Sequence, residues 1–304
     1  MHFDCDIYYG SIIKGDLRRA IAYVKQFPEK SDLNHRLASV FEHEQYRSYD
    51  VDAELNGILL SYQQYYRDAF YLCIAREQAE NKLKERLARR LGVADQHIPL
   101  CRLEQKNLVD LFESRGLHFL GGKTGGYYGP YIWRTTETVS YDVALPHGVQ
   151  SCSVKMLDGF IARSWMDYLS FGEIGSGGWT DGDGTISCVK SAWDFDGESF
   201  RVSLLKHEAQ HAQDLKRNRN MSSEDLEYRA KLVELIYSTE RNLLCTFARE
   251  ADDSDRNNGH AMAAYRIVQG FSDLLQVDDL QPAAVSIAQI QTIARTLFEN
   301  STRY

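Results

Sequence analysis

The sequence predicts an α+β fold with a helical N-terminal lobe, a small central sheet that is mostly antiparallel, and a helical C-terminal lobe. Three observations lead to this prediction. Apolar residues recur at three- and four-residue spacing from about residue 11 to 115, glycines and β-branched residues gather between 116 and 189, and the helical spacing returns from residue 199 onward. Helices, then strands, then helices again is an order typical of α+β proteins.

The first 115 residues are expected to form one helical bundle. Pro28 is the one proline before Pro99, so little in the sequence interrupts the helical spacing. The basic residues between positions 82 and 90 are interleaved with Leu83, Leu87 and Leu91, which indicates the solvated face of a helix. We therefore expect a helical N-terminal region over 1–115 and a second domain over 116–304.

The central region is expected to contain short strands. Four segments are rich in β-branched residues or alternate in polarity, and glycine, proline and aspartate bound them: 131–134, 139–145, 150–156 and 185–189. Residues 158–169 have the apolar spacing of a short amphipathic helix. The sheet is therefore expected to be small, with one helix inserted between its strands.

Composition argues against several classes of protein. The net charge is −8 and the basic residues are scattered, so we expect no nucleic-acid partner. No apolar stretch approaches the roughly 18 residues of a membrane span, and the N-terminus lacks the features of a signal peptide, so we expect no membrane association and a cytoplasmic location. The six cysteines are widely spaced without a CxxC pair, which favours reduced thiols.

A His-Glu-x-x-His motif at residues 207–211 carries the candidate chemistry. Apolar residues at helical spacing surround it, with Ser199 as the expected N-cap. In a helix His207 and His211 lie one turn apart on one face, so both imidazoles can bind one zinc ion (Zn2+). Glu208 is rotated by roughly 100° and can take a proton from a water on that ion. We therefore predict two metal ligands and a general base.

A third ligand is expected from the next helix. A short polar turn follows the motif, and Ser222 or Ser223 is placed to cap a second helix. Such a turn makes the second helix run antiparallel to the first and past the two histidines. Glu227 lies in its early part and is our predicted third metal ligand, with Glu234 on the same stripe as the alternative.

This motif, followed by a glutamate on the next helix, resembles the gluzincin branch of the zincin metallopeptidases. The match covers about 30 residues, from 203 to 234. The resemblance implies a zinc peptidase, with a zincin-like C-terminal lobe and with both helices of the motif beneath the substrate site. Glu227 is closer in sequence to His211 than the third ligand of that branch commonly is, which leaves the choice between Glu227 and Glu234 open.

The resemblance also suggests supporting residues. In this branch an edge strand upstream of the metal helix holds the substrate, and residues 177–179, followed by 185–189, are the candidate here. His260 resembles the histidine that donates to the developing oxyanion in thermolysin-like enzymes, and Asp252, Asp253 and Asp255 could orient it. Tyr228 is the alternative donor. Asp214, one turn beyond His211, is a candidate acceptor for a ligand imidazole.

The function expected from these features is hydrolysis of a peptide bond in a peptide or protein substrate by a zinc metallopeptidase. Glu208 is the expected general base and His260 the second catalytic residue. Two alternatives stay open. One is a protein-interaction module with a structural zinc site, against which Glu208 argues because a structural site does not need a carboxylate there. The other is a metal-dependent hydrolase of a non-peptide bond.

Overall fold

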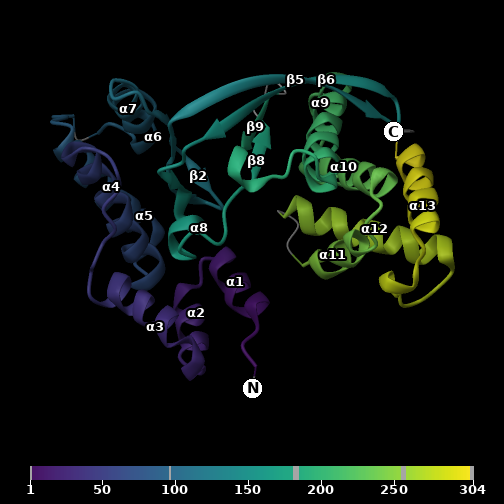
Figure 1. Ribbon diagram of the computed structural model, residues 1–304, viewed down its shortest axis with the longest axis horizontal. Helices are drawn as coiled ribbons and strands as arrows, with labels where there is room; N and C mark the ends of the chain where they lie inside the picture. Colours follow the sequence, from purple (N-terminus) through teal and green to yellow (C-terminus); the bar gives the residue numbers. More distant parts are fainter. Residues whose placement is uncertain (1, 96, 181–184, 255–257, 302–304) are drawn as a thin grey trace. The chain divides into compact units, whose positions relative to one another are not determined.

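The computed structural model describes residues 2–95, 97–180, 185–254 and 258–301 (Figure 1). The chain divides into two compact units. Unit 1 comprises residues 1–135 and 157–176, and unit 2 comprises residues 136–156 and 177–304. Helices at both ends of the chain and small antiparallel sheets between them confirm the predicted α+β class.

Helices form most of unit 1. They are α1 (Cys5–Ile13), α2 (Leu17–Val24), α3 (Ser31–Leu37), α4 (Ala53–Tyr66), α5 (Arg76–Arg90), α6 (Leu100–Arg102), α7 (Val109–Glu113) and α8 (Ser164–Leu169). A short 3-10 helix η1 (Pro28–Lys30) and three π-helical segments, η2 (Ala38–Glu42), η3 (Arg67–Tyr71) and η4 (Leu103–Leu108), extend or precede several of them. The buried faces of α4 and α5 pack against each other, as the spacing of Leu83 and Leu87 indicates.

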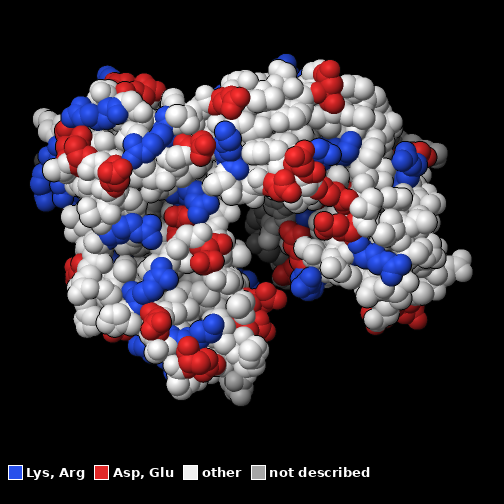
Figure 2. All heavy atoms as spheres, in the orientation of Figure 1, with Lys and Arg blue, Asp and Glu red and all other residues white. Residues whose placement is uncertain are grey.

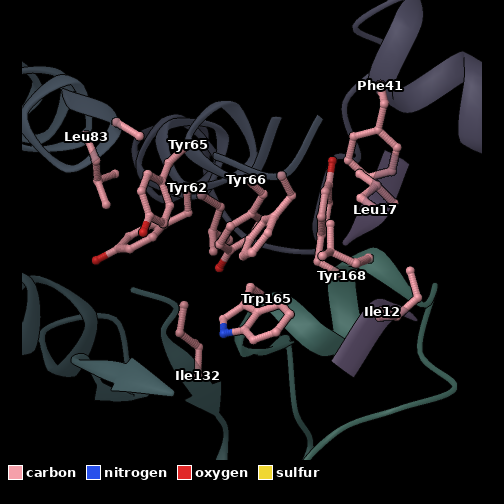
Figure 3. Packing of buried hydrophobic residues seen from close by; sticks show 14 of the residues in the cluster. Ile12, Leu17, Phe41, Tyr62, Tyr65, Tyr66, Leu83, Ile132, Trp165 and Tyr168 are labelled. Atoms are coloured by element: carbon pink, nitrogen blue, oxygen red, sulfur yellow. The ribbon is translucent and has the colours of Figure 1, made fainter. Parts of the chain in front are cut away.

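Two small sheets complete unit 1. Strands β1 (His118–Leu120), β4 (Tyr131–Trp133) and β7 (Ala162–Arg163) pair antiparallel in the order β1-β4-β7, and β2 (Lys123–Thr124) pairs with β3 (Tyr127–Tyr128). The core of the unit is rich in aromatic rings. Figure 3 shows the tyrosines of α4 projecting toward Trp165 and Ile132. The Trp165 ring stacks on Phe70 with centroids 4.8 Å apart.

Helix α8 is shorter than the helix expected over 158–169. Gly159 and Ser164 both have positive φ values, 69° and 63°, which a continuous right-handed helix does not allow. Between these two residues, Ala162 and Arg163 form strand β7, and Ala162 pairs with Ile132 of β4. The predicted helix therefore begins only at Ser164, after one more strand.

Unit 2 contains a four-stranded sheet. Its strands are β5 (Thr135–Leu145), β6 (Gly148–Asp158), β9 (Ile186–Val189) and β8 (Gly178–Thr180), in the order β5-β6-β9-β8. Strand β8 pairs antiparallel with β9 and lies at one edge of the sheet, so the expected edge strand is found at 178–180, next to the predicted 177–179. Residues 186–189 of the predicted segment 185–189 form β9, which lies between β6 and β8 and is not an edge strand. A 3-10 turn, η5 (Lys190–Ala192), follows β9.

The helices of unit 2 follow this sheet in the chain. They are α9 (His207–Arg217), α10 (Ser223–Tyr237), α11 (Asn242–Glu250), α12 (Gly259–Leu275) and α13 (Ile287–Asn300), with a 3-10 turn η7 (Pro282–Ala284) before the last. Helix α10 packs against α9, α12 and α13 (Figure 1). The second core of the chain, with Leu232, Phe271 and Phe298 fully buried, lies in this unit.

The metal-motif helix begins differently from the prediction. Residues Ser199–Lys206 form a π-helix, η6, and the α-helix α9 starts at His207. Glu198 occupies the cap position, and its carboxylate accepts hydrogen bonds from the side chain of Ser238 and the backbone of Thr239 instead of capping the helix. Ser199 is therefore the first helical residue, and the predicted N-cap at this position is wrong. The predicted cap of the next helix is confirmed, because Ser222 accepts from the Asp225 amide at 3.1 Å.

The described surface carries both signs of charge. Figure 2 shows lysine and arginine side chains scattered among aspartates and glutamates on the face in view.

Among the described helices, none has both the length and the apolar composition that crossing a lipid bilayer requires.

Candidate metal centre

Helix α9 brings the two histidines of the motif together in unit 2. His207 opens the helix and His211 follows one turn later, so both imidazoles lie on the same face. Their Nε2 atoms are 3.0 Å apart and their rings are nearly perpendicular. His207 is buried and His211 is largely covered, so both rings are held by packing. The pairing of the two imidazoles is therefore the one expected from the four-residue spacing.

Helix α10 adds the carboxylate of Glu227. Oε2 of Glu227 lies 3.3 Å from Nε2 of His207, and Oε1 lies 3.4 Å from Nε2 of His211. The three residues offer ligand atoms that all lie within 4.8 Å of one another. The short turn between α9 and α10 thus places Glu227, the first-choice third ligand, against both histidines.

Glu234 lies on the other side of the His207 ring. Its Oε1 is 2.7 Å from Nδ1 of His207, and both side chains are about nine-tenths buried. A carboxylate in this place accepts a hydrogen bond from Nδ1–H and leaves Nε2 directed at His211 and Glu227. Glu234, the alternative ligand, therefore lies where it can orient a ligand.

Helix α12 brings His260 to the exposed side of the same cluster. Its Nδ1 is 3.0 Å from Oε2 of Glu227, and its side chain is 58% exposed, so the cluster reaches solvent here. Gly259 permits this approach, because a Cβ at this position would come within 2.6 Å of Oγ of Ser223 at the start of α10. Asn258 caps α12 by accepting from the Ala261 amide. Asp255, one of the aspartates expected to orient His260, lies outside the described residues.

The carboxylate of Glu208 contacts the edge strand of the sheet. Its Oε2 accepts a hydrogen bond from the hydroxyl of Thr180, the last residue of edge strand β8. The side chain is partly exposed and does not belong to the His207, His211 and Glu227 group. Glu208 is therefore adjacent to the histidines in sequence while its carboxylate is held by a different element.

Two further candidates are placed away from the cluster. Asp214 was expected to accept from a ligand imidazole, but its Oδ2 pairs with Nε of Arg229 at 2.8 Å in a buried ion pair. Glu234 takes the position beside His207 instead. Tyr228 belongs to the core of unit 2, where the guanidinium of Arg266 lies 4.2 Å from its ring centroid. The structure thus brings His260, and not Tyr228, against the ligand group.

Burial and charge shift the pKa values of two residues in the cluster. Burial works to lower the pKa of His207, but the carboxylates of Glu227 and Glu234 outweigh burial and raise this pKa to about 10. Burial works to raise the pKa of Glu227, but the three imidazoles around it hold this pKa well below its usual range. Glu227 is therefore ionised at neutral pH, and positive charge between these groups is strongly favoured.

The donor set fits a zinc ion. Atoms that share a tetrahedral zinc at 2.0–2.1 Å lie about 3.3 Å apart. Here the two Nε2 atoms are 3.0 Å apart, Nε2 of His207 lies 3.3 Å from Oε2 of Glu227, and Nε2 of His211 lies 3.4 Å from Oε1 of the same carboxylate. Two imidazole nitrogens and one carboxylate oxygen are donors that zinc accepts. Among the described buried atoms, Oε2 of Glu227 lacks a hydrogen-bond partner although two imidazole nitrogens face it. A cation between these groups would satisfy that oxygen.

Known families and structures give no further guide to this site. Comparisons of the chain with family models, with curated proteins and with solved structures find no match.

Sequence reasoning missed two residues that contact the motif helix: Thr180, which binds Glu208, and Arg229, which pairs with Asp214. Thr180 is 28 positions before Glu208 and reaches it through sheet pairing, for which the sequence carries no local signal. Arg229 follows Glu227 by two residues, and its pairing with Asp214 depends on how α9 and α10 pack. The sequence did indicate that Glu234 lies near the site, because it follows Glu227 by seven residues and so shares its helix face.

Proposed function

We propose that the chain is a zinc-dependent metallopeptidase in which His207, His211 and Glu227 hold the ion and Glu208 is the general base. The observation that carries this proposal is that His207, His211 and Glu227 offer ligand atoms within 4.8 Å of one another, with the two Nε2 atoms 3.0 Å apart and each within 3.4 Å of an oxygen of Glu227. When bound, zinc acts as a Lewis acid that makes water more acidic and polarises a carbonyl group.

Glu208 supports an enzyme over a structural zinc site. A structural site closes with a fourth protein ligand, whereas three protein ligands leave one position for water or substrate. The carboxylate of Glu208 is outside the ligand group and is partly exposed, which suits a base that meets water. The exposed His260 contacts Glu227, so the cluster is accessible from solvent.

Glu208, His260 and Glu234 have different proposed roles in the hydrolysis. Glu208 takes a proton from water as the water oxygen bonds to the carbonyl carbon, and it then gives that proton to the nitrogen that leaves when the C–N bond breaks. His260, at the exposed edge, is the proposed donor to the negative oxygen that forms on the former carbonyl. Glu234 holds the ring of His207 through Nδ1 and so keeps Nε2 available.

The proposal is tested by metal analysis combined with a cleavage assay. The purified chain is expected to contain about one zinc per molecule and to cleave members of a peptide library. Removal of the metal with a chelator is expected to abolish cleavage, and added zinc to restore it. Zinc bound without cleavage of peptides or of folded protein substrates would favour the interaction module, and cleavage of ester or amide compounds alone would favour the non-peptide hydrolase.

A further inference from the structure

Edge strand β8 places a hydroxyl directly on the proposed base. The hydroxyl of Thr180 donates a hydrogen bond to Oε2 of Glu208. We propose that Thr180 is a positioning residue, which holds one carboxylate oxygen of Glu208 so that Oε1 can accept the proton of the attacking water. This inference rests on the proposed function, because it assigns Thr180 a task only if Glu208 is the base.

Strand β8 is fixed firmly enough for this task. Its three residues pair in register with β9, and Thr180 lies opposite Ile186, which is fully buried in the core of unit 2. At the other end of β8, the carbonyl of Gly177 accepts hydrogen bonds from the Trp193 indole at 2.7 Å and from the Val189 amide at 2.9 Å. The strand is therefore held along its length by backbone and side-chain bonds.

The strand also lies close to the segment that leads into the metal helix. Residues two apart in a strand share a face, so Thr180 points to the same side as the Cβ direction of Gly178. A Cβ built on Gly178 would lie 3.1 Å from a methyl carbon of Leu204 in η6 and 2.7 Å from the carbonyl oxygen of Ser187. Glycine thus lets β8 pack against the segment that continues into α9, and this packing places Thr180 beside Glu208.

A hydrogen bond from Thr180 to one oxygen of the Glu208 carboxylate limits the orientations that the other oxygen, the proposed proton acceptor, can adopt. Glutamate has several rotatable bonds, and an unrestrained side chain loses freedom when it orients for the reaction. A hydrogen bond to a charged group is among the stronger ones in proteins, so its loss is expected to slow the reaction about tenfold to hundredfold. Since Thr180 is not proposed to contact substrate, the loss is expected in kcat more than in KM.

The experiment compares Thr180→Val, which removes the hydroxyl and keeps the shape, with Thr180→Ser, which keeps the hydroxyl. Thr292→Val is the matched control, because that exposed threonine on α13 donates only to the Ala288 carbonyl within its own helix. We expect Thr180→Val to retain zinc and lose kcat, and Thr180→Ser and Thr292→Val to stay near wild type. If Thr180→Val keeps the wild-type kcat while Glu208→Gln is inactive, Thr180 does not position Glu208, and the proposed function still stands. Wild-type kcat in Glu208→Gln would overturn the proposed function.

A second readout does not depend on activity. Thr180→Val is introduced into the wild type and into a Glu208→Leu background, and urea unfolding of each protein as isolated is followed by circular dichroism. If the hydroxyl binds Glu208, Thr180→Val lowers the unfolding midpoint of the wild type and has little effect when Glu208 is absent. Equal shifts in the two backgrounds would contradict the contact, and with it the inference, whatever the cleavage assay gives.

Discussion

Nδ1 of His207 and Oε1 of Glu234 are 2.7 Å apart in the interior of unit 2. The carboxylate therefore holds Nδ1–H of an imidazole whose other nitrogen faces His211 and Glu227. Because Glu234 is on α10, the same helix supplies both a proposed metal ligand, Glu227, and the group that orients another, His207.

Replacement of Glu234 tests this relationship. Glu234→Ala is expected to weaken zinc binding by about 10- to 100-fold, because His207 loses the acceptor that orients its ring, and Glu234→Gln is expected to have a smaller effect. The measurement is competition for zinc with a chelator of known affinity. Glu299→Ala, an exposed position on α13, is the control. Unchanged zinc affinity in Glu234→Ala would show that His207 does not need this carboxylate.

The metal content of the histidine variants tests the ligand assignment. His207→Ala and His211→Ala are each expected to lose the zinc found in the wild type, because both imidazoles are required ligands. Elemental analysis after gel filtration, with circular dichroism to check the fold, is the measurement. Stoichiometric zinc in the double alanine variant would place the metal elsewhere in the chain.

The buried ion pair of Asp214 and Arg229 makes a prediction about stability. Arg229→Met leaves the Asp214 carboxylate buried without its partner and is expected to lower the free energy of unfolding by about 3–5 kcal/mol. The double variant Asp214→Leu, Arg229→Met removes both charges and is expected to recover most of that loss. Urea unfolding provides the comparison. Equal losses in the single and double variants would mean that packing, and not charge, accounts for the effect.

Glu104 of unit 1 makes a prediction about pH. It is buried and accepts from the Tyr62 hydroxyl and the Gly122 amide, and burial raises its pKa from 4.5 to about 7. The folded state thus favours the neutral acid. Its contribution to stability is complete below pH 4.5 and is lost as the pH rises toward 7, by about 3 kcal/mol.

The matched variant for this pH effect is Glu104→Gln, which does not titrate. The free energy of unfolding of the wild type relative to this variant is expected to fall between pH 4.5 and 7.5, as measured by urea unfolding across that range. A constant difference between the two proteins would mean that Glu104 titrates alike in the folded and unfolded chain.

Local spacing in the sequence was enough to predict the helical hairpin of the candidate site. The four-residue separation of His207 and His211 places them on one helix face, and the short turn after α9 brings Glu227 back to them. These relationships arise from helix geometry within about 30 residues, which does not depend on the remainder of the fold.

Features that depend on packing between distant segments could not be predicted in this way. Thr180 reaches Glu208 through the pairing of β8 with β9, and His260 reaches Glu227 because Gly259 permits close approach of α12 to α10. The late start of α8 depends on the left-handed backbone of Ser164, an uncommon conformation for serine that apolar spacing does not reveal. Similarly, the spacing of residues 199–206 is compatible with both a π-helix and an α-helix.

The most direct test of the account compares wild type and Glu208→Gln for zinc content and peptide cleavage in parallel. Glutamine keeps nearly the same volume, and Glu208 is not among the ligand residues, so the variant is expected to retain its fold and its zinc. Without the carboxylate, turnover is expected to fall by about 10²- to 10⁴-fold. A variant that keeps both its zinc and its full rate of cleavage would contradict the assignment of Glu208 as the base.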